Sequence, residues 1–355
     1  MKKEVGSIFP LSNEALCEAE GKKATFSGNI IYYSLCREAL HDIAMYLKSK
    51  GGDTVMIPAY TCQTVITPFE EAGWKCIFYP IQKNLRIDTY NLEILASQHH
   101  PSVIIVHPFY GMDLNHEEEA SIQEIGSNNV RVILDLTQCL FSTKRYSFVD
   151  FTVASYRKWF PIPDGGYLKS GSNTAISQPE MDYKEFTERE IAAMYLRGQY
   201  FANGHQRTKA ISIQLSKSAD HIAEHNITPH KMSDVAYNLL QKENIQDNQN
   251  QRLKNYTFLY SNICESKEVK KVCQNIDEVT TAPLYFTIYV QNRKALQHLL
   301  AQDAIYAPVI WPVENDRVLI NDDLRYIYDH ILAIPCDQRY NTEDMQRAVN
   351  IINNY

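Results

Sequence analysis

The 355-residue chain lacks long apolar runs, basic tracts and closely spaced cysteine pairs. No apolar stretch approaches the roughly 20 residues of a membrane-spanning helix, and the N-terminal "SIFPL" is short and soon followed by acidic residues. We therefore expect a cytoplasmic protein without a membrane segment. The 35 basic and 42 acidic residues give a formal charge of -7. Since there is also no Arg-rich aromatic platform, nucleic acid is not an expected partner.

The eight cysteines are scattered, with no Cys-x-x-Cys and no paired metal-ligand spacing. Such usage is typical of reduced, buried thiols in a cytoplasmic protein. We expect no zinc site.

The first half of the chain, from about Ile30 to Leu168, alternates helical patterns with short apolar runs bounded by turn residues. This alternation is typical of repeated βαβ units, so we predict an α/β fold with a mostly parallel sheet. An amphipathic helix with a glycine stop is expected from Leu35 to Gly52. The other expected elements are strands at 54–60, 75–81, 102–111, 131–138 and from Phe151, with helices at 62–73, 89–99 and 116–127.

The second half changes to long helical segments, and one of them is expected from Met232 to Ile263. From "APLYFTIYVQNRKALQHLLAQDAIYAPVIWP" onward, which starts at Ala282, we expect a strand, a helix and a second strand. A C-terminal helix should start at Asn341-Thr342. A chain of this length fits a large domain and a smaller one, which we place at residues 1–240 and 241–355.

Polar residues follow four of the expected strands. Ligands of parallel sheets gather at the carboxyl ends of the strands. We therefore expect one site formed by Tyr60-Thr61, His107 to Gly111, Asp135 to Gln138, and Ser155 to Lys158.

The stretch "ASYRKWFPIPDGG", residues 154–166, places Arg157 and Lys158 directly after a buried strand. A buried cationic cluster costs free energy unless it is paired. The candidate partners are an acidic neighbour, an anionic ligand, or a carbonyl that bonds to the amine. For Arg157 we expect a structural ion pair with a carboxylate such as Asp164.

Pyridoxal 5'-phosphate (PLP) would supply a carbonyl for Lys158. This cofactor needs a carboxylate beside its ring nitrogen, which Asp135 offers, and a contact on its hydroxyl side, where Gln138 is placed. Its phosphate needs donors, which Ser155 and the helix start at Cys36-Arg37 offer.

Each of these residues also has a structural interpretation. Lys158 fits a surface lysine of a non-enzymatic α/β protein, and Asp135 fits a cap of the following turn. His107 is more typical of a hydrogen-bonded histidine near the core than of a catalytic base. Arg339 with Tyr340 fits recognition of a substrate carboxylate or phosphate, and fits equally well a tie between the C-terminal segment and the core.

The order of motifs along the chain resembles a known family. Over residues 28–170, "SLCREAL", "DTVMIPAYTCQTV", "VIIVHPFYG", "VILDLTQ", "SYRKW" and "PDGGYL" are similar to the fold-type I PLP-dependent enzymes, and most of all to the DegT/StrS group of sugar aminotransferases. The segments "HKMSDVAYNLL" and "PCDQRYNTEDM" are more weakly similar to that group's dimer-loop helix and C-terminal segment. The resemblance implies a PLP-binding homodimer. It places Lys158 at the Schiff-base position, Asp135 beside the pyridinium, Gln138 as the adjacent ring contact and Ser155 as a phosphate ligand.

The chain departs from the group at the phosphate-binding helix start, which usually reads Gly-Thr or Gly-Ser. Here it reads Cys36-Arg37, so the Arg37 guanidinium is the expected replacement donor. The group's Asn-x-Arg-Met is also changed, with Pro229 at the Asn position and Lys231 at the Arg position.

A further departure is Cys62, which stands at the usually aromatic ring-stacking position. Tyr60, or His107 with Tyr110, is then expected to cover the ring, although Tyr60 fits packing equally well.

We therefore expect a PLP-dependent aminotransferase that takes an amino group from a small-molecule donor to a keto-sugar or similar keto acceptor. The first alternative is another PLP-dependent transferase or lyase on the same fold. A sugar dehydratase of the group would typically carry His where this chain keeps Lys158. The second is a non-catalytic descendant that binds a ligand, which the departures at Cys36, Cys62 and Pro229 keep open.

Overall fold

The computed structural model describes residues 3–19, 21–26, 29–171 and 175–355. The chain forms two compact units, and each is made of separate segments. Unit 1 comprises Ile8–Gly51 and Phe151–Asn244, and unit 2 comprises Lys2–Ser7, Gly52–Asp150 and Ile245–Tyr355.

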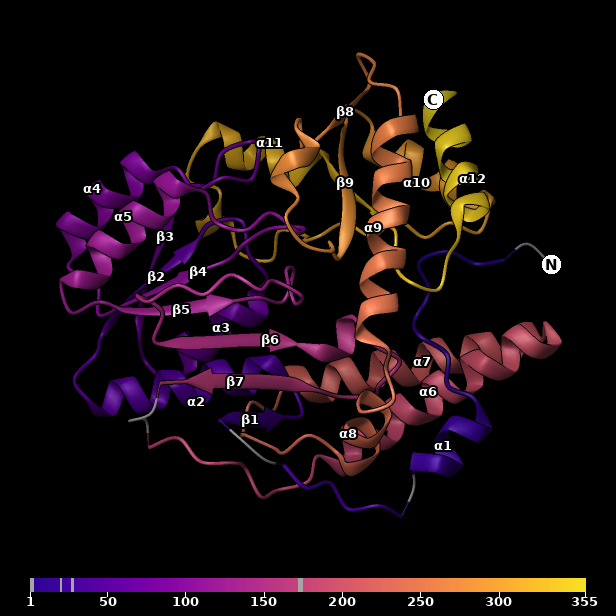
Figure 1. Cartoon of the computed structure of the whole chain (residues 1–355), viewed down its shortest axis with the longest axis horizontal. Coiled ribbons are helices and arrows are strands. Elements are labelled where there is room, and N and C mark those ends of the chain that lie inside the picture. The colour runs from indigo at the N-terminus through magenta and orange to yellow at the C-terminus, as the bar shows by residue number, and fades with distance from the viewer. Residues whose placement is uncertain (1–2, 20, 27–28, 172–174) are drawn as a thin grey trace. The chain divides into compact units, whose positions relative to one another are not determined.

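Seven strands form a mostly parallel central sheet (Figure 1): β1 (Ile30–Tyr33), β2 (Thr54–Pro58), β3 (Lys75–Tyr79), β4 (Val103–Val106), β5 (Arg131–Asp135), β6 (Phe151–Ser155) and β7 (Gly166–Ser170). Their order is β1-β7-β6-β5-β4-β2-β3. Strand β2 pairs in parallel with β3 and β4, and β4 with β5, whereas β7 is antiparallel to β1 and β6. Every residue of β2 and β4 is buried, as expected for parallel strands covered on both faces. The predicted α/β fold is confirmed.

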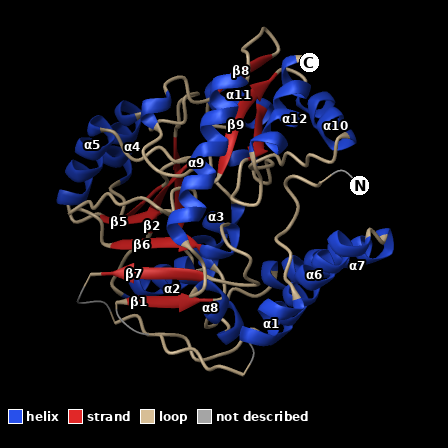
Figure 2. Ribbon diagram, turned by 45° about the vertical axis from the view of Figure 1, so that its right-hand side comes forward, coloured by secondary structure: helices blue, strands red, loops and turns tan. Residues whose placement is uncertain are grey.

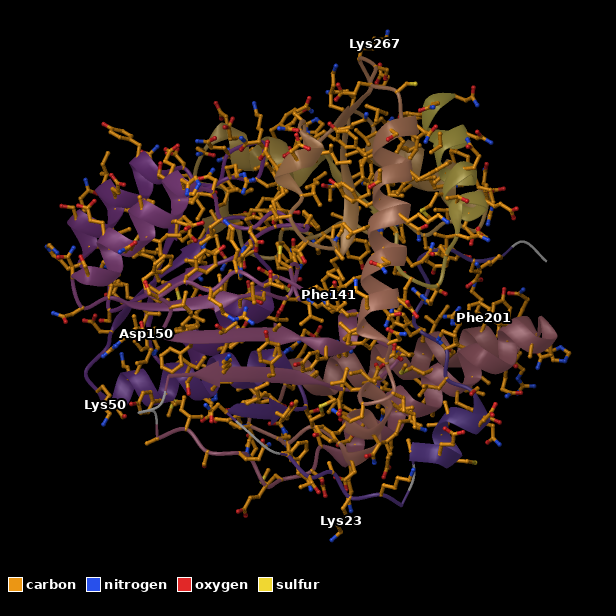
Figure 3. The ribbon with its side chains drawn as sticks, viewed as in Figure 1. Lys23, Lys50, Phe141, Asp150, Phe201 and Lys267 are labelled. Carbon is orange, nitrogen blue, oxygen red and sulfur yellow. The ribbon has the colours of Figure 1, made fainter. Side chains whose placement is uncertain are left out.

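The helices of unit 1 are α1 (Asn13–Ala19), α2 (Cys36–Ser49), α6 (Lys184–Asn203), α7 (Gln206–Glu224) and α8 (Asp234–Leu240), with the 3-10 turn η1 (Tyr156–Lys158). The helix expected after Leu35 is α2, which buries Leu40, Ile43 and Leu47 on one face. It ends before Gly51, whose φ of 93° suits a residue without a side chain. Helices α6 and α7 lie side by side (Figure 2), and Phe201 of α6 is exposed (Figure 3).

The helices of unit 2 are α3 (Gln63–Glu71), α4 (Thr89–His99), α5 (His116–Ser127), α9 (Ile245–Asn262), α10 (Arg293–Gln302), α11 (Asp322–His330) and α12 (Thr342–Asn353), with the short 3-10 turns η2 (Ile276–Glu278) and η3 (Asp316–Val318). The predicted bounds of α4 and α5 are confirmed. The predicted start of α12 is confirmed too, because Asn341 Oδ1 accepts the N–H groups of Glu343 and Asp344. No helix in the described part of the chain is long and apolar enough to cross a membrane.

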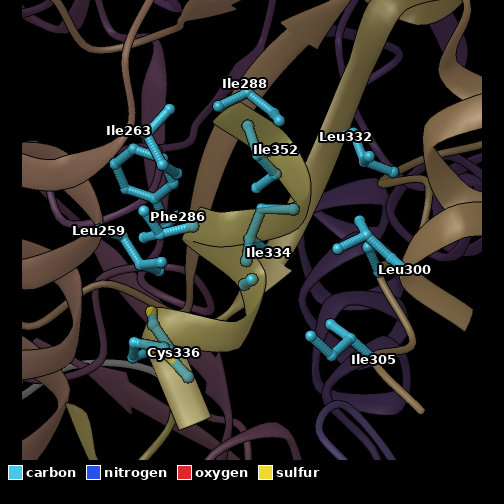
Figure 4. Close-up of a cluster of buried hydrophobic side chains, with 14 of the residues drawn as sticks. Leu259, Ile263, Phe286, Ile288, Leu300, Ile305, Leu332, Ile334, Cys336 and Ile352 are labelled. Carbon is cyan, nitrogen blue, oxygen red and sulfur yellow. The ribbon is translucent and has the colours of Figure 1, made fainter. Parts of the chain in front are cut away.

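Unit 2 also contains a three-stranded antiparallel sheet in the order β10-β9-β8, formed by β8 (Val269–Lys271), β9 (Tyr285–Val290) and β10 (Ile331–Pro335). Its apolar side chains pack with α9 and α12 (Figure 4). Phe286, Ile334, Leu259 and Ile352 are each at most 2% exposed. Burying a side chain of this kind stabilises the fold by about 1.5–3 kcal/mol.

One sequence prediction in the later part of the chain is wrong. The segment from Met232 to Ile263 is not one helix, because α8 and α9 bury their apolar faces in different units. The strand, helix and strand expected after Ala282 are present as β9, α10 and β10, with the additional helix α11 directly before β10.

Candidate functional site

Three strand ends of unit 2 lie close together. Asp135, the last residue of β5, is 5% exposed, and its Oδ1 accepts the N–H of Thr137 at 2.8 Å. Its Oδ2 lies 3.5 Å from Nδ1 of His107, which follows β4. The other ring nitrogen of His107 lies 2.9 Å from Oγ1 of Thr61, which follows β2. Asp135 therefore caps its own turn and still holds one oxygen beside a histidine.

Gln138 lies against the turn that follows β4. It is 4% exposed, and its Oε1 accepts the N–H of Tyr110 at 3.3 Å. The neighbouring Cys139 Sγ accepts the N–H of Gly111 at 3.2 Å. The two loops are thus held against each other by the backbone of one and the side chains of the other.

Tyr60 is buried in an aromatic cluster of unit 2. Its hydroxyl lies 3.1 Å from that of Tyr110, and its ring centroid lies 5.0 Å from Trp311 and 5.3 Å from Tyr328. Burial raises the pKa of the Tyr60 hydroxyl well above its ordinary value. These contacts favour packing as the role of Tyr60. Cys62 is only half-buried and lies directly before α3.

Lys158 and Arg157 of unit 1 differ in their surroundings. Arg157 Nη2 lies 3.4 Å from Oδ1 of Asp220 on α7, and its guanidinium lies over the ring of Phe186. The structural ion pair expected for Arg157 is confirmed, although its carboxylate partner is Asp220 on α7 and not Asp164. Lys158 is exposed and forms no hydrogen bond or ion pair within the described part of the chain. Of the two cations, Lys158 is the one left available for a ligand.

The paired glycines after Lys158 bring β7 against the start of α2. Gly165 has a φ of 142°, its N–H bonds to the carbonyl of Ser34 at 2.6 Å, and its own carbonyl accepts the N–H of Tyr156 at 2.8 Å. A Cβ on Gly166 would lie 2.5 Å from the backbone nitrogen of Cys36. Ser155 of β6 is buried and pairs with Gly166 across the strands. The "PDGG" motif thus allows the lysine turn, β7 and the helix start to meet within unit 1.

The side chain of Arg37 forms a hydrogen bond to α7. Its Nη1 donates to the carbonyl of Ala223, in the last turn of that helix, at 3.0 Å. Cys36, the first residue of α2, is half-buried. Lys231, at the other changed position, pairs with Asp182 at 3.1 Å.

The sequence reasoning missed a buried pair formed by Glu38 and His230. Oε1 of Glu38 lies 2.9 Å from Nδ1 of His230, and the two residues are 0% and 3% exposed. Oε2 of Glu38 accepts the backbone N–H groups of Leu35 and His230, each at 3.2 Å. A glutamate three residues after a helix cap commonly accepts such a bond, so this bond was detectable in the sequence. The contact with His230, 192 residues away, was not.

The described residues form neither a candidate metal centre nor a disulfide. The described residues contain no group of three His, Cys, Asp or Glu side chains arranged for a metal ion. All eight cysteines are free thiols.

The fold has clear counterparts among solved structures. No protein-family model and no curated protein sequence matches the chain. The sugar aminotransferase CalS13 from Micromonospora echinospora superposes with a TM-score of 0.68 at 13% identity, covering 98% of both chains. The PLP form of Spr1654 from Streptococcus pneumoniae gives 0.70 at 13% identity, covering 99% of this chain and 98% of that one. A DegT DnrJ EryC1 StrS aminotransferase from Brucella abortus gives 0.65 at 15% identity, covering 96% and 94%.

The chain has the sugar-aminotransferase fold. The similarity extends over almost the whole length, including the helical and C-terminal parts that resembled the group only weakly in sequence.

Arg339 is tied into the C-terminal part of this sugar-aminotransferase fold. Its Nε and Nη2 donate to the two oxygens of Asp337, each at 2.8 Å, and its Nη1 donates to the carbonyl of Ser7 at 2.8 Å. The neighbouring Tyr340 accepts the N–H of Gly6 at 2.8 Å. This arrangement favours the structural interpretation of both residues.

Asp164, directly before the paired glycines, is fully buried. Its Oδ2 accepts from Thr187 Oγ1 at 2.7 Å, and its Oδ1 accepts from the N–H and the hydroxyl of Ser233, each at 3.1 Å. Burial raises the pKa of Asp164 to about 7, and these hydrogen bonds offset part of that effect. The carboxylate thus joins α6 and the segment before α8 to the glycine turn.

Asp164→Asn should change how stability depends on pH. The folded chain keeps a proton on Asp164 that the unfolded chain releases between about pH 4 and 7, so the free energy of unfolding should fall as pH rises through that range. One group contributes at most about 1.4 kcal/mol per pH unit. Urea unfolding at several pH values should give a flatter curve for Asp164→Asn, whereas Asp182→Asn, at a more exposed carboxylate, should keep the wild-type slope. An unchanged slope in Asp164→Asn would contradict the assignment.

Proposed function

We propose that the chain is a PLP-dependent aminotransferase in which the Lys158 amine bonds to the cofactor aldehyde. The observation that carries this proposal is the availability of Lys158 at the end of β6, beside an arginine that is already paired. The fold supports it, since CalS13 is a sugar aminotransferase and Spr1654 has been solved with PLP. We propose a keto-sugar or similar keto compound as the amino acceptor.

The residues of unit 1 fit the aldehyde and phosphate ends of PLP. Lys158 offers an amine without a protein partner in the described residues. The start of α2 faces a position that only a glycine, Gly166, can occupy, and the buried hydroxyl of Ser34 lacks a hydrogen-bond partner in the described structure. A helix start of this kind favours a phosphate group. Ser155, Cys36 and Arg37 belong to the same proposed set.

The residues of unit 2 fit the ring of PLP. The Asp135 carboxylate would keep the ring nitrogen protonated, and Gln138 would contact the hydroxyl side. His107, hydrogen-bonded by Thr61, would hold the orientation of Asp135. We retain Tyr60 and Cys62 as proposed neighbours of the ring, although the packing of Tyr60 favours an indirect role.

The cofactor and the proposed residues would have separate roles in the reaction. When bound, PLP supplies an aldehyde that accepts an amino group and a ring that withdraws electrons. The Nζ of Lys158 would act as the base and acid that moves a proton from the substrate carbon to the former aldehyde carbon of the cofactor. Asp135 would keep a proton, and with it a positive charge, on the ring nitrogen, which would strengthen the electron withdrawal by the ring.

The absorption spectrum of the purified protein with added PLP tests the proposal. A band at visible wavelengths should appear, and borohydride should fix the cofactor to a peptide containing Lys158. Adding amino donors should then discharge the band with formation of a keto acid. No band in a folded protein would contradict the proposal and favour a ligand-binding descendant. Loss of water or another group from the substrate, without amino transfer, would favour a lyase.

We also propose a cytoplasmic homodimer, on the basis of the resemblance of the sequence to its group. Light scattering of the purified protein measures the oligomeric state, and a mass near 40.9 kDa would contradict the dimer.

A further inference from the structure

Glu38 lies in the turn of α2 where the phosphate of PLP is proposed to bind. Its carboxylate is completely buried and occupies the positive end of the helix dipole. Burial raises the pKa of the Glu38 carboxyl, and the contact with His230 offsets part of that effect. When Glu38 is ionised, a phosphate at the same helix start would face a second negative charge. Repulsion in a partly buried environment is screened much less than in water, so a positive charge beside Glu38 would favour phosphate binding.

His230 is the side chain placed to supply that charge. Its Nδ1 lies 2.9 Å from Oε1 of Glu38, and its ring stacks on Tyr183 with centroids 3.9 Å apart and an angle of 11°. The backbone carbonyl of His230 also accepts the N–H of Ser34 at 2.9 Å. The side chain of His230 therefore contacts Glu38, and its backbone helps to hold Ser34, two residues before α2.

The other titratable and charged groups near the pair have contacts of their own. Burial raises the pKa of Asp164 and the nearby Glu38 adds to the rise, so Asp164 supplies no positive charge. The hydroxyl of Tyr33 donates a hydrogen bond to Asp42 at 2.7 Å, and the ring of Tyr183 stacks on the imidazole of His230. The guanidinium of Arg37 donates to the carbonyl of Ala223 and belongs to the proposed phosphate-binding set, so its charge would act on the phosphate directly, whereas His230 contacts Glu38.

We propose that His230 is a positioning residue for phosphate binding, which acts by holding and neutralising Glu38 at the start of α2. The proposal rests on the proposed function, since it concerns the phosphate of the same cofactor. It would also explain how a helix start with a buried glutamate could bind the phosphate proposed for it. No step of the chemistry at Lys158 is assigned to His230.

Two cofactor forms separate this role from a general effect on folding. PLP and pyridoxal share the aldehyde and ring, but pyridoxal has no phosphate. In His230→Asn the amide can still donate to Glu38, but it carries no charge. The dissociation constant for PLP should rise by about tenfold, and that for pyridoxal should stay within about twofold of wild type.

Removing the charge of Glu38 should restore the PLP affinity that His230→Asn loses. In the double variant Glu38→Gln/His230→Asn the unpaired charge is gone, so the dissociation constant for PLP should return to within about threefold of wild type. Glu38→Gln alone, which keeps an acceptor for Leu35, should bind PLP as well as wild type. Ser212→Ala serves as the matched control, because Ser212 is buried in unit 1 and its hydroxyl donates to the carbonyl of Ala193 on α6 at 2.7 Å. It should lower the melting temperature without changing the ratio of the two affinities.

The outcomes distinguish this inference from the proposed function. Equal losses for PLP and pyridoxal in His230→Asn, or a double variant weaker than the single one, would overturn the role of His230 and leave the aminotransferase proposal standing. A wild-type protein that binds neither form would overturn both.

Discussion

Replacing Lys158 by alanine should abolish the visible absorption band with PLP and lower amino transfer by at least about a thousandfold. The amine both bonds to the cofactor and moves a proton during the reaction, so one substitution removes two functions. The side chain is exposed and has no described protein partner, and the melting temperature should therefore stay close to that of wild type. Absorption spectra and single-turnover measurements with an amino donor test this prediction.

Two controls show whether the effect belongs to the amine. Lys158→Arg keeps the positive charge but forms no stable bond with an aldehyde, so it should lose the band as completely as alanine does. Arg157→Ala breaks the contact with Asp220 and leaves Lys158 in place, so the band should persist. A Lys158→Ala protein that still shows the band would place the reactive amine elsewhere in the chain.

Asp135→Asn should lower amino transfer by about 10²–10³-fold while the absorption band remains. An asparagine can still accept the N–H of Thr137, which Asp135 Oδ1 accepts at 2.8 Å, so the turn should keep its shape. It carries no charge, however, and cannot hold a proton on the ring nitrogen. The measurement is the rate of the single-turnover reaction, compared with the band intensity at equilibrium.

The matched control for this variant is Asp113→Asn. Asp113 is another buried carboxylate of unit 2, and it accepts from Ser142 Oγ at 2.5 Å and from Thr280 Oγ1 at 2.8 Å. Its loss should reduce stability but leave the single-turnover rate unchanged. If the two variants lose activity equally, Asp135 acts only through the fold.

Local sequence patterns were sufficient to predict most of the helices and strands in the first half of the chain. Helices α4 and α5 begin and end where the apolar spacing and capping residues indicate. The strand ends were found for the same reason, since a buried strand reads as an apolar run that stops at polar residues. The domain boundaries at 1–240 and 241–355 and the roles of the individual site residues stay predictions.

Contacts between distant segments could not be read in this way. The partner of Arg157 is Asp220 on α7, and nothing near Arg157 in the sequence points to it. The pairing of Glu38 with His230 likewise depends on how β1 and the segment before α8 come together.

The sequence by itself determined the order of the elements and the types of residue at the strand ends, because periodicity and turn residues act over a few positions of the chain. The tertiary structure decided which charges are neutralised. It paired Arg157, left Lys158 available, and buried Glu38 against His230. The physical reason is that burial and ion pairing depend on distances between residues that lie far apart in the chain, which only the folded arrangement brings within reach.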